Sequence, residues 1–395
     1  MVVAGVMSGT SADGVDVALC RVSPPASPGG FPQLELLVHR AISFDAETRG
    51  AILAAMDAGQ TSTATLARLS WRLGEVYAEA VQQTIAASGI TPALVALHGQ
   101  TIYHQASASE FLGTPVRCTW QIGEPAILAE HLHLPVISDF RTADVAAGGQ
   151  GAPLVPMLDL CLYRHPTHNR ILLNLGGIAN LTALPAHCDA AAVLAFDTGP
   201  ANMVVDGCMQ QLYGRAFDCE GGTGARGQVL EPVVRELLED AYLRLSPPKS
   251  CGREQYGTSF ADRLITRCQR DGACNTDIIA TATAFTAETI LAACHRFVFP
   301  HLRTHAPEAA KTEMFVSGGG AHNVALMRRL RESLLPFSCS VNTTEEAGTA
   351  SLGVEAKEAA AFALLGWLSW HRLPGNLPAA TGASRPVVLG RLTYV

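Results

Sequence analysis

The fold of this chain is decided by residues 5–16, which read Gly5-Val6-Met7-Ser8-Gly9-Thr10-Ser11-Ala12-Asp13-Gly14-Val15-Asp16. This stretch overlaps two apolar runs, residues 2–7 and residues 15–22, and the positions between them are rich in glycine and hydroxyl groups. Because glycine adopts the positive φ angles of tight turns, the pattern predicts two β-strands joined by a glycine-rich turn. Glycine also lets backbone N–H groups approach an anion closely. The stretch therefore predicts either an ordinary hairpin or a phosphate-binding turn.

The side chains of this turn add to the phosphate-binding hypothesis. Thr10 and Ser11 supply hydroxyl donors. Asp13 and Asp16 supply carboxylates, which could hold Mg²⁺ through water because hard cations prefer oxygen ligands. The candidate nucleotide-binding positions in the turn are Gly9, Thr10, Ser11, Ala12, Asp13, Gly14, Val15 and Asp16.

The rest of the chain alternates between short apolar runs and segments with helical spacing. Such alternation is typical of α/β proteins, in which ligands gather at the carboxyl ends of the strands. We therefore expect two α/β lobes that face one cleft. The predicted strands are residues 2–7, 15–22, 34–43, 93–97, 135–138, 171–175, 193–196 and 314–316, and the predicted helices are residues 61–88, 201–212, 277–297 and 353–370.

Composition and charge argue against several classes of protein. The chain has 395 residues, of which 48% are hydrophobic, and this is enough for two domains with large cores. A formal net charge of −7 gives little attraction for nucleic acid or anionic lipid. The apolar runs noted above are too short to span a bilayer, and the 11 cysteines contain no C-x-x-C pair. We expect a cytoplasmic protein with reduced thiols and with no membrane or nucleic-acid partner.

Two further glycine clusters follow predicted strands, at residues 174–180 and 317–323. A nucleotide held between two lobes needs contacts from both, and an adenosine needs backbone without side chains beside it. The sequence contains no P-loop, no protein-kinase signature, and no dinucleotide fingerprint at its strand-to-helix junctions. Three glycine loops therefore favour nucleotide binding over a simple hairpin. The candidate positions in the two later clusters are Gly176, Gly177, Gly318, Gly319, Gly320 and Asn323.

A single carboxylate, Asp197, stands at the end of a predicted strand. It follows the apolar residues 193–196, and Gly199 and Pro200 turn the chain just after it. An aspartate at this place is expected to point into the cleft. The structural alternative is a cap for the helix predicted from residue 201 onward. We favour catalytic or metal-linked use because the glycine clusters accompany it.

Polar residues in apolar settings predict a sugar site. Most of them follow a predicted buried strand, and one lies within a mostly apolar helix. Sugars need several hydrogen-bond partners, and a carboxylate on a sugar needs a cation such as Arg141. Each residue also has a structural alternative, namely a buried ion pair, a strand cap or a solvated helix face. The candidate sugar-binding positions are His98, Gln100, Asp139, Arg141, Asp144 and Glu358.

Taken in order, these motifs resemble the anhydro-N-acetylmuramic acid kinase family. The resemblance covers nearly the whole chain, and the combined pattern is highly specific. The chain departs from the family pattern at Cys251, where threonine is expected, and at residues 23–32, which look like an insertion. The motifs that carry the resemblance are residues 5–16, 98–101, 121–125, 139–144, 148–156, 174–182, 196–200, 247–250, 375–378 and 381–383.

The resemblance implies a place in the sugar kinase, Hsp70 and actin superfamily. It implies a two-lobed, actin-like ATPase fold of RNase H-like topology, with ATP and Mg²⁺ in a central cleft. Residues 9–16 would form the first phosphate loop, residues 176–177 the second, and residues 318–320 the adenosine contact. The positions that match the family's sugar site are Thr10, Asp139, Arg141 and Glu358.

Three sections of the chain are expected to form the two lobes. Residues 1–138 would form the first lobe, with the first phosphate loop and part of the sugar site. Residues 355–395 would return to that lobe. Residues 139–354 would form the second lobe, with the second phosphate loop, the catalytic aspartate and the adenosine contact.

The resemblance also implies a reaction. ATP, water and 1,6-anhydro-N-acetylmuramic acid would give N-acetylmuramic acid 6-phosphate and ADP, in the recycling of peptidoglycan. O6 of the anhydro sugar is an ether oxygen without a proton, so water must attack C1 while O6 takes the γ-phosphoryl group. That water needs a general base, and the resemblance assigns this role to Asp197.

Three alternatives stay open at this point. The first is a kinase for another sugar or polyol, which would phosphorylate a free hydroxyl. The second is a nucleotide-gated binding protein of the Hsp70 or actin type, and the third is a relic that no longer binds ATP. The sequence also leaves the oligomeric state open, including a homodimer.

Overall fold

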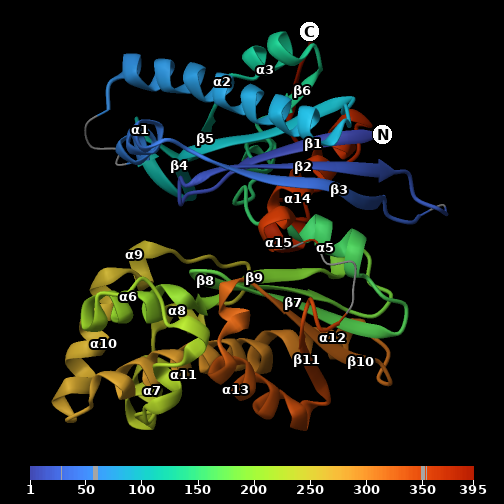
Figure 1. The fold of residues 1–395 in the computed structure, drawn as a ribbon. Helices are drawn as coiled ribbons and strands as arrows, with labels where there is room; N and C mark the ends of the chain where they lie inside the picture. Colours follow the sequence, from blue (N-terminus) through green and yellow to red (C-terminus); the bar gives the residue numbers. More distant parts are fainter. Residues whose placement is uncertain (28, 57–60, 348–351, 353) are drawn as a thin grey trace. The chain divides into compact units, whose positions relative to one another are not determined.

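The computed structural model describes residues 1–395 with the exception of 28, 57–60, 348–351 and 353 (Figure 1). The chain divides into two compact units. The first comprises Met1–Leu162 and Leu352–Val395, and the second comprises Tyr163–Ser351. Both units are α/β, as the sequence predicts. Residue 28 of the loop at 23–32 and residue 353 of the last predicted helix lie outside the described residues.

The boundary between the units differs from the one expected from the sequence. Residues 139–162 belong to the first unit rather than to the second. A backbone hydrogen bond shows the reason, since Gln150 N donates to Thr381 O at 2.8 Å. The segment after residue 138 is therefore tied to the C-terminal part of the chain, and that part belongs to the first unit.

The first unit is built on a mixed sheet. Its strands are β1 (Val2–Ser8), β2 (Gly14–Ser23), β3 (Gln33–Ser43), β4 (Leu94–Phe111), β5 (Thr114–Ile122), β6 (Val136–Ser138) and β12 (Arg391–Thr393). The strand order is β12-β6-β4-β1-β2-β3, and β5 pairs with β4. β1, β2 and β3 form an antiparallel meander, whereas β1, β4 and β6 run parallel. The parallel strands therefore end at one edge of the sheet, where ligands gather in α/β proteins.

Helices cover both faces of β1. The helices of this unit are α1 (Ala46–Met56), α2 (Thr63–Ser88), α3 (Pro125–Leu132), α4 (Thr142–Ala146), α5 (Pro156–Tyr163), α14 (Val354–Trp370) and α15 (Pro378–Thr381). Ala4 and Val6 of β1 join a core cluster with Tyr77 of α2. Gly5 points to the opposite face because side chains alternate along a strand, and it contacts α14. β1 is therefore enclosed between α2 and α14, and its residues 3–8 are all buried.

α14 approaches the sheet with no side chain in between. A Cβ atom at Gly5 would lie 1.8 Å from Ala359 O, and a Cβ atom at Gly366 would lie 2.5 Å from Ala96 Cβ. Neither distance is compatible with a side chain. Gly5 therefore allows the backbone of α14 to lie directly against β1, and Gly366 allows the helix to lie against the methyl group of Ala96 on β4.

The second unit repeats the strand order of the first. Its strands are β7 (His168–Leu175), β8 (Ile178–Leu184), β9 (Leu194–Pro200), β10 (Lys311–Ser317) and β11 (Cys339–Thr343). In the order β11-β10-β7-β8-β9, the meander β7-β8-β9 is antiparallel, whereas β7, β10 and β11 run parallel. An antiparallel meander with parallel strands added beside its first strand is the RNase H-like topology expected for both lobes.

A long apolar helix forms the core of the second unit. The helices are α6 (Asn202–Tyr213), α7 (Glu231–Leu237), α8 (Ala241–Arg244), α9 (Arg253–Tyr256), α10 (Thr258–Arg270), α11 (Asn275–Ala293), α12 (Phe299–His305) and α13 (Val324–Leu334). α11 continues through a π-helical turn, Cys294–Val298, into α12. By length and composition, Asn275–His305 is apolar enough to cross a membrane, and it is longer than the apolar runs noted in the sequence. However, 83% of its most apolar window is buried inside the structure, which is typical of a core helix.

Several strands carry no clear signal in the sequence. β4 continues far beyond the predicted residues 93–97 and pairs with β5 in a long hairpin. Most residues of this hairpin are polar or exposed, so apolar periodicity does not mark it. β8 follows a glycine pair that predicted only a loop, and β11 and β12 are short strands that were also missed. These strands depend on pairing with a neighbour rather than on local pattern.

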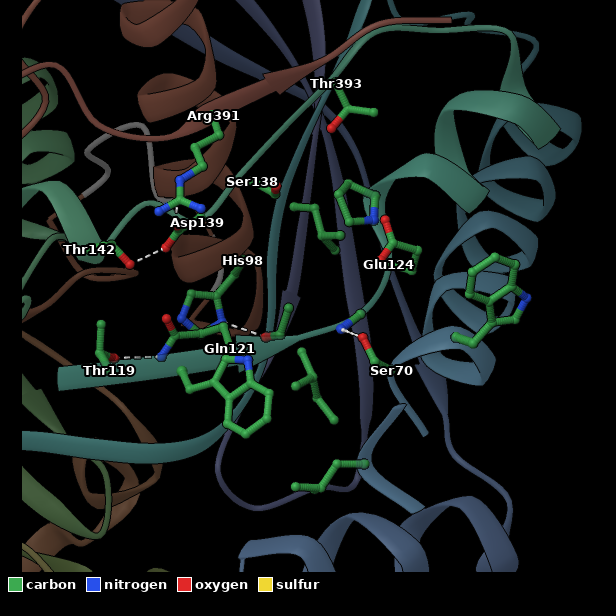
Figure 2. Close-up of a pocket in the computed structure, with 18 of the residues that line it drawn as sticks. Ser70, His98, Thr119, Gln121, Glu124, Ser138, Asp139, Thr142, Arg391 and Thr393 are labelled. Carbon is green, nitrogen blue, oxygen red and sulfur yellow. Dashed lines mark hydrogen bonds and ion pairs between the residues drawn. The ribbon is translucent and has the colours of Figure 1, made fainter. Parts of the chain in front are cut away.

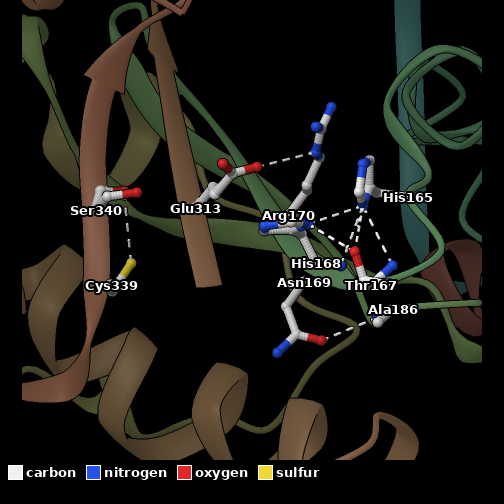
Figure 3. A network of polar contacts seen from close by, with 9 residues as sticks. All are labelled: His165, Thr167, His168, Asn169, Arg170, Ala186, Glu313, Cys339 and Ser340. Atoms are coloured by element: carbon white, nitrogen blue, oxygen red, sulfur yellow. Dashed lines mark hydrogen bonds and ion pairs between the residues drawn. The ribbon is translucent and has the colours of Figure 1, made fainter. Parts of the chain in front are cut away.

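The start of β7 is fixed by a network of polar contacts (Figure 3). His165 Nδ1 accepts the N–H groups of Thr167 and His168, each at 3.2 Å. Since this nitrogen accepts, the His165 ring carries its proton on Nε2. Arg170 Nε lies 3.3 Å from Glu313 Oε2 on the neighbouring strand β10. The contacts tie the turn before β7 to the parallel pair β7 and β10.

We expect Gly5→Ala to lower the free energy of unfolding by about 3 kcal/mol or more, because the new methyl group would overlap the backbone of α14. Gly50→Ala is the matched control. Gly50 lies in α1, it is exposed, and nothing stands within 4 Å of an added Cβ atom. That variant should be more stable by about 1 kcal/mol, because alanine favours helix over glycine. Urea unfolding measures both values. Equal effects would contradict the direct contact between β1 and α14.

Candidate active site

The turn after β1 presents polar groups to solvent. Ala12 is buried, has a φ angle of 53°, and donates its N–H to Gly9 O at 3.2 Å, which closes the turn. Thr10, Ser11 and Asp13 are exposed. Their side chains are therefore available to a ligand, whereas Ala12 can contribute only its backbone.

The end of the turn is tightly packed. A Cβ atom at Gly14 would lie 2.4 Å from Ile42 O, so only glycine fits beside β3. Val15 is buried in the core and offers no side chain to a ligand. Asp16 Oδ1 lies 2.8 Å from His39 Nε2, so one carboxylate oxygen already has a partner within the unit.

The two carboxylates of the turn fit a magnesium ion that is mostly held by water and phosphate. Among the described residues, no group of three or more His, Cys, Asp or Glu side chains is arranged to hold a metal by itself. Mg²⁺ usually keeps several waters and binds through one or two carboxylates together with substrate phosphates. Asp13 accepts one hydrogen bond from Ser11 Oγ and is otherwise exposed. The chemistry of Asp13 and Asp16 thus suits magnesium in the presence of a nucleotide.

Gln100 supports the turn from inside the unit. It is fully buried, its Nε2 donates to Gly9 O at 3.1 Å, and its Oε1 accepts a hydrogen bond from Ser8 Oγ. Both ends of the amide are therefore used by β1 and its turn. This arrangement favours a role in holding the turn over direct contact with a sugar.

His98 and Arg141 form a buried pair with a defined proton position. Arg141 Nε donates to His98 Nε2 at 3.0 Å, and Arg141 Nη1 donates to Gly151 O at 2.7 Å. Because His98 Nε2 must accept, the proton lies on Nδ1, which is 2.7 Å from Gly99 O. Burial and the charge of Arg141 hold the pKa of His98 well below its usual value. His98 is therefore a neutral residue that orients the guanidinium.

Asp144 is a buried anchor. It has no exposed surface, and its carboxylate accepts hydrogen bonds from Gly151 N (2.8 Å), Asn376 Nδ2 (2.7 Å) and Thr381 Oγ1 (2.7 Å). With three protein donors, the carboxylate has little capacity left for a ligand. We therefore assign Asp144 to positioning the loop at 148–151 rather than to contact with sugar.

Glu358 lies near the beginning of α14, where the charges of Arg141 and Asp16 act on its carboxyl. Glu358 is exposed, but surrounding protein atoms restrict the hydration of its carboxyl group, and this raises its pKa. The charge of Arg141 opposes the rise, whereas the charge of Asp16 adds to it. Three residues that are far apart in the sequence thus lie close enough to influence one another.

A cavity of about 800 Å³ lies in the first unit, beside two of the predicted sugar-binding residues, His98 and Asp139 (Figure 2). Asp139 has a φ angle of 61°, and its Oδ2 lies 2.9 Å from Arg391 Nε. The cavity mixes aromatic and polar side chains, as sugar sites commonly do. The cavity is also lined by residues for which the sequence predicted no role, among them Trp71, Trp120, Gln121, Glu124 and Arg391.

Asp197 stands inside β9 of the second unit, whereas the sequence predicted a strand that ends at residue 196. The strand continues because residues 197–200 go on pairing with β8. Asp197 is held mainly by backbone groups. Its Oδ2 accepts the N–H of Cys251 at 3.0 Å, and its own carbonyl accepts the hydroxyl of Tyr242 at 2.7 Å. Burial raises the pKa of Asp197 to about 6, although the Cys251 N–H and the charge of Lys249 lower it. A partly buried carboxylate with a pKa near 6 is suited to general-base chemistry at neutral pH.

The two later glycine clusters meet in the same unit. A Cβ atom at Gly318 would lie 2.6 Å from Leu175 O, and one at Gly320 would lie 2.7 Å from Leu175 Cβ. Gly176 O and Gly177 O accept N–H groups from residues 201–203 at the beginning of α6. The loops after β7 and β10 are therefore packed together and joined to the start of α6.

Asn323 caps a helix beside this cluster. Its Oδ1 accepts the N–H of Leu326 at 3.0 Å, at the start of α13. A Cβ atom at Gly221 would lie 2.2 Å from that same oxygen. Gly221 is therefore a further glycine of this region, and the sequence gives no signal for it because Gly221 follows no strand. Its φ angle of 72° is the structural reason for glycine there.

The whole chain matches one family. A family model described as anhydro-N-acetylmuramic acid kinase matches residues 1–395. Proteins of that name from Bacillus cereus strains ATCC 10987 and G9842 are 38% and 39% identical over 397 residues. Each alignment covers 100% of this chain and 99% of the relative.

Similar solved structures are more distant. The activator of the 2-hydroxyisocaproyl-CoA dehydratase from Clostridium difficile is 11% identical, with coverage of 93% of this chain and 94% of its own and a TM-score of 0.41. A ROK hexokinase from Thermus thermophilus is 13% identical, with coverage of 94% and 99% and a TM-score of 0.40. The full-length sequence matches decide the assignment: this chain belongs to the anhydro-N-acetylmuramic acid kinase family.

Proposed function

We propose that this protein uses ATP and water to convert 1,6-anhydro-N-acetylmuramic acid into N-acetylmuramic acid 6-phosphate and ADP, in the recycling of cell-wall sugar. The family match over the whole chain supports the reaction class. The observation that carries the mechanism is Asp197, a carboxylate within the strand β9 with a pKa of about 6. A cytoplasmic location stays a prediction from the sequence, which leaves the oligomeric state open.

In this mechanism Asp197 acts as the general base. Its carboxylate takes a proton from water, and the water oxygen forms a bond to C1 of the sugar. The C1–O6 bond breaks, O6 forms a bond to the γ-phosphorus, and the bridging oxygen leaves with ADP. The N–H of Cys251 holds one oxygen of Asp197, so the other oxygen is left for the water. Fixed orientation of this kind is what a positioned base requires.

The first unit supplies the groups for phosphate and sugar. The exposed hydroxyls of Thr10 and Ser11 and the turn backbone are assigned to the phosphates. Asp13 and Asp16 would hold Mg²⁺ through water, and the ion would neutralise charge on the phosphoryl oxygens. Asp139 and Glu358 are assigned to the sugar hydroxyls, and Arg141 to the lactyl carboxylate. Arg141 is oriented by its hydrogen bonds to His98 and Gly151.

The second unit supplies the groups for adenosine and for the second phosphate contact. Gly176 and Gly177 are assigned to phosphate, whereas residues 318–320 and Asn323 are assigned to the adenosine. The packing of these loops supports the assignment. Gly318 and Gly320 lie against Leu175, and because they have no side chains their backbone is free of bulk beside a ligand.

The reaction is tested by the fate of labelled solvent oxygen. In H₂¹⁸O, with anhydro-N-acetylmuramic acid and ATP, we expect ¹⁸O at C1 of freshly formed product and none in its phosphoryl group. An ATPase would place the label in free phosphate, and a kinase for a free hydroxyl would place it nowhere. Glucose, N-acetylglucosamine and N-acetylmuramic acid serve as competing substrates. Faster ADP release with any of them would overturn the substrate assignment.

We expect Asp197→Asn to lower kcat at least ~100-fold, because the amide keeps the shape of the side chain but cannot accept the proton of water. The affinity for ATP should change little, since the side chain is assigned to the water and the sugar. Steady-state kinetics measures kcat. Calorimetry measures nucleotide affinity, with ADP in place of ATP so that no reaction occurs. Near-normal turnover of this variant would exclude Asp197 as the base.

The rate should also depend on pH through this carboxyl. The base works only when ionised, so kcat/KM should be constant above about pH 7 and fall tenfold per unit well below the Asp197 pKa of about 6. Asp206→Asn is the matched control, since burial and the charge of Asp218 raise the pKa of Asp206 to about 6 as well. That variant should keep the acid midpoint. If the midpoint were lost in Asp206→Asn, the pH dependence would belong to Asp206 and not to Asp197.

A further inference from the structure

Lys249 is an unusual residue beside the proposed base, because its ammonium is buried among aromatic rings. The residue is only 7% exposed. Its Nζ lies 4.6 Å from the ring centroid of Tyr242, 5.3 Å from that of Phe297 and 5.8 Å from that of Phe196. Such contacts stabilise a cation that has lost its water.

The ammonium is also bonded to two carbonyl groups. Nζ donates to Tyr242 O at 3.2 Å and to Leu243 O at 3.4 Å. Within the part of the chain that the structure describes, no carboxylate lies at ion-pair distance from this nitrogen. The side chain therefore has little freedom to reach a ligand, and its contacts fix residue 249 in place.

The segment 249–251 holds Asp197 on two sides. Asp197 N donates to Lys249 O at 3.2 Å, and Cys251 N donates to Asp197 Oδ2 at 3.0 Å. Tyr242, whose ring covers the ammonium, donates its hydroxyl to Asp197 O at 2.7 Å. Anchoring of Lys249 therefore fixes both the backbone and the carboxylate of Asp197.

The charged groups around Asp197 give Lys249 an electrostatic role as well. Burial raises the pKa of the Cys251 thiol to about 12 and raises that of the Tyr242 hydroxyl, so both stay neutral at physiological pH. Burial and the charge of nearby Arg296, which donates to Leu243 O at 3.3 Å, lower the pKa of Lys249 to about 8, so its ammonium is mostly charged at neutral pH. Among the described residues, Lys249 is the cation whose charge acts on Asp197. A cation near a carboxylate favours its ionised form.

We propose that Lys249 is a positioning residue for the general base: its caged ammonium anchors the segment that holds Asp197 and keeps that carboxylate ionised near neutral pH. This inference rests on the role proposed for Asp197. Two of the three N–H donors of Lys249 are used inside the unit, so we assign it no contact with sugar or phosphate.

Lys249→Met tests the proposal, since methionine keeps the apolar stem and removes the charge. The titration of Asp197 is followed by infrared spectroscopy with ¹³C-labelled aspartate, as the difference from Asp197→Asn. We expect the carboxyl midpoint to rise by about one pH unit. A shift of that size lowers kcat/KM about fivefold at pH 6 and leaves it within twofold at pH 8.5. An unchanged midpoint, or an equal loss of rate at both pH values, would overturn the proposal.

Two controls separate the charge of Lys249 from its packing. Arg296→Met removes a donor to the same carbonyl group, Leu243 O, and should not move the Asp197 midpoint. Lys249→Arg keeps the charge and should keep the midpoint within a few tenths of a unit. If Lys249→Met does not fold, Lys249→Gln, which can still donate to the carbonyl groups, takes its place with the same expected shift.

The spectroscopic titration needs no substrate, so the two proposals fail in different ways. An incorrect sugar assignment would abolish turnover of the anhydro sugar but leave the Asp197 titration measurable in every variant. An incorrect role for Lys249 would leave turnover of the wild type intact and the titration of Lys249→Met unshifted.

Discussion

The contact on which the first unit depends is the one between the backbone of β1 at Gly5 and the backbone of α14 at Ala359. No side chain separates the two backbones, so the distance of α14 from β1 and its position along the strand are both fixed. Glu358 precedes Ala359 directly, and the turn at 9–16 follows β1 directly. A single close approach of two backbones therefore brings a carboxylate from the C-terminal part of the chain near Arg141 and Asp16. It is a steric constraint, and it is satisfied only by glycine.

In the second unit, the corresponding constraint is electrostatic. A carboxylate that is to act as a base needs partial burial to raise its pKa, and it also needs donors so that it stays ionised. Asp197 obtains both from its strand and from the segment around Cys251. The donor is a backbone N–H, which explains why cysteine is tolerated where threonine was expected. The departure at Cys251 does contact Asp197, the proposed base, but through a backbone N–H that every residue except proline has.

The residues predicted to bind sugar divide into two kinds. Asp139 and Glu358 are residues with some solvent exposure, whereas Gln100 and Asp144 are fully buried and use their polar atoms on the turn at 9–16 and on the loop at 148–151. Burial of a polar group requires partners, and the nearest partners here are the backbone groups of the binding loops. The polar groups of the second kind therefore stabilise the backbone of these two loops. Trp71 and Trp120, which line the same cavity as Asp139, add apolar surface to it.

Local sequence pattern was sufficient to predict the α/β class, most of the buried strands and the glycine loops. These features depend on local pattern, because apolar runs and glycine turns are set by neighbouring residues. The hairpin of β4 and β5, the strand β8 and the boundary after Leu162 were decided only by the tertiary structure. They depend on backbone pairing between distant residues, which leaves no periodic signal. The same holds for the proton position on His98, the anchoring of Asp144 and the aromatic cage of Lys249, because each is a contact between segments that the sequence separates.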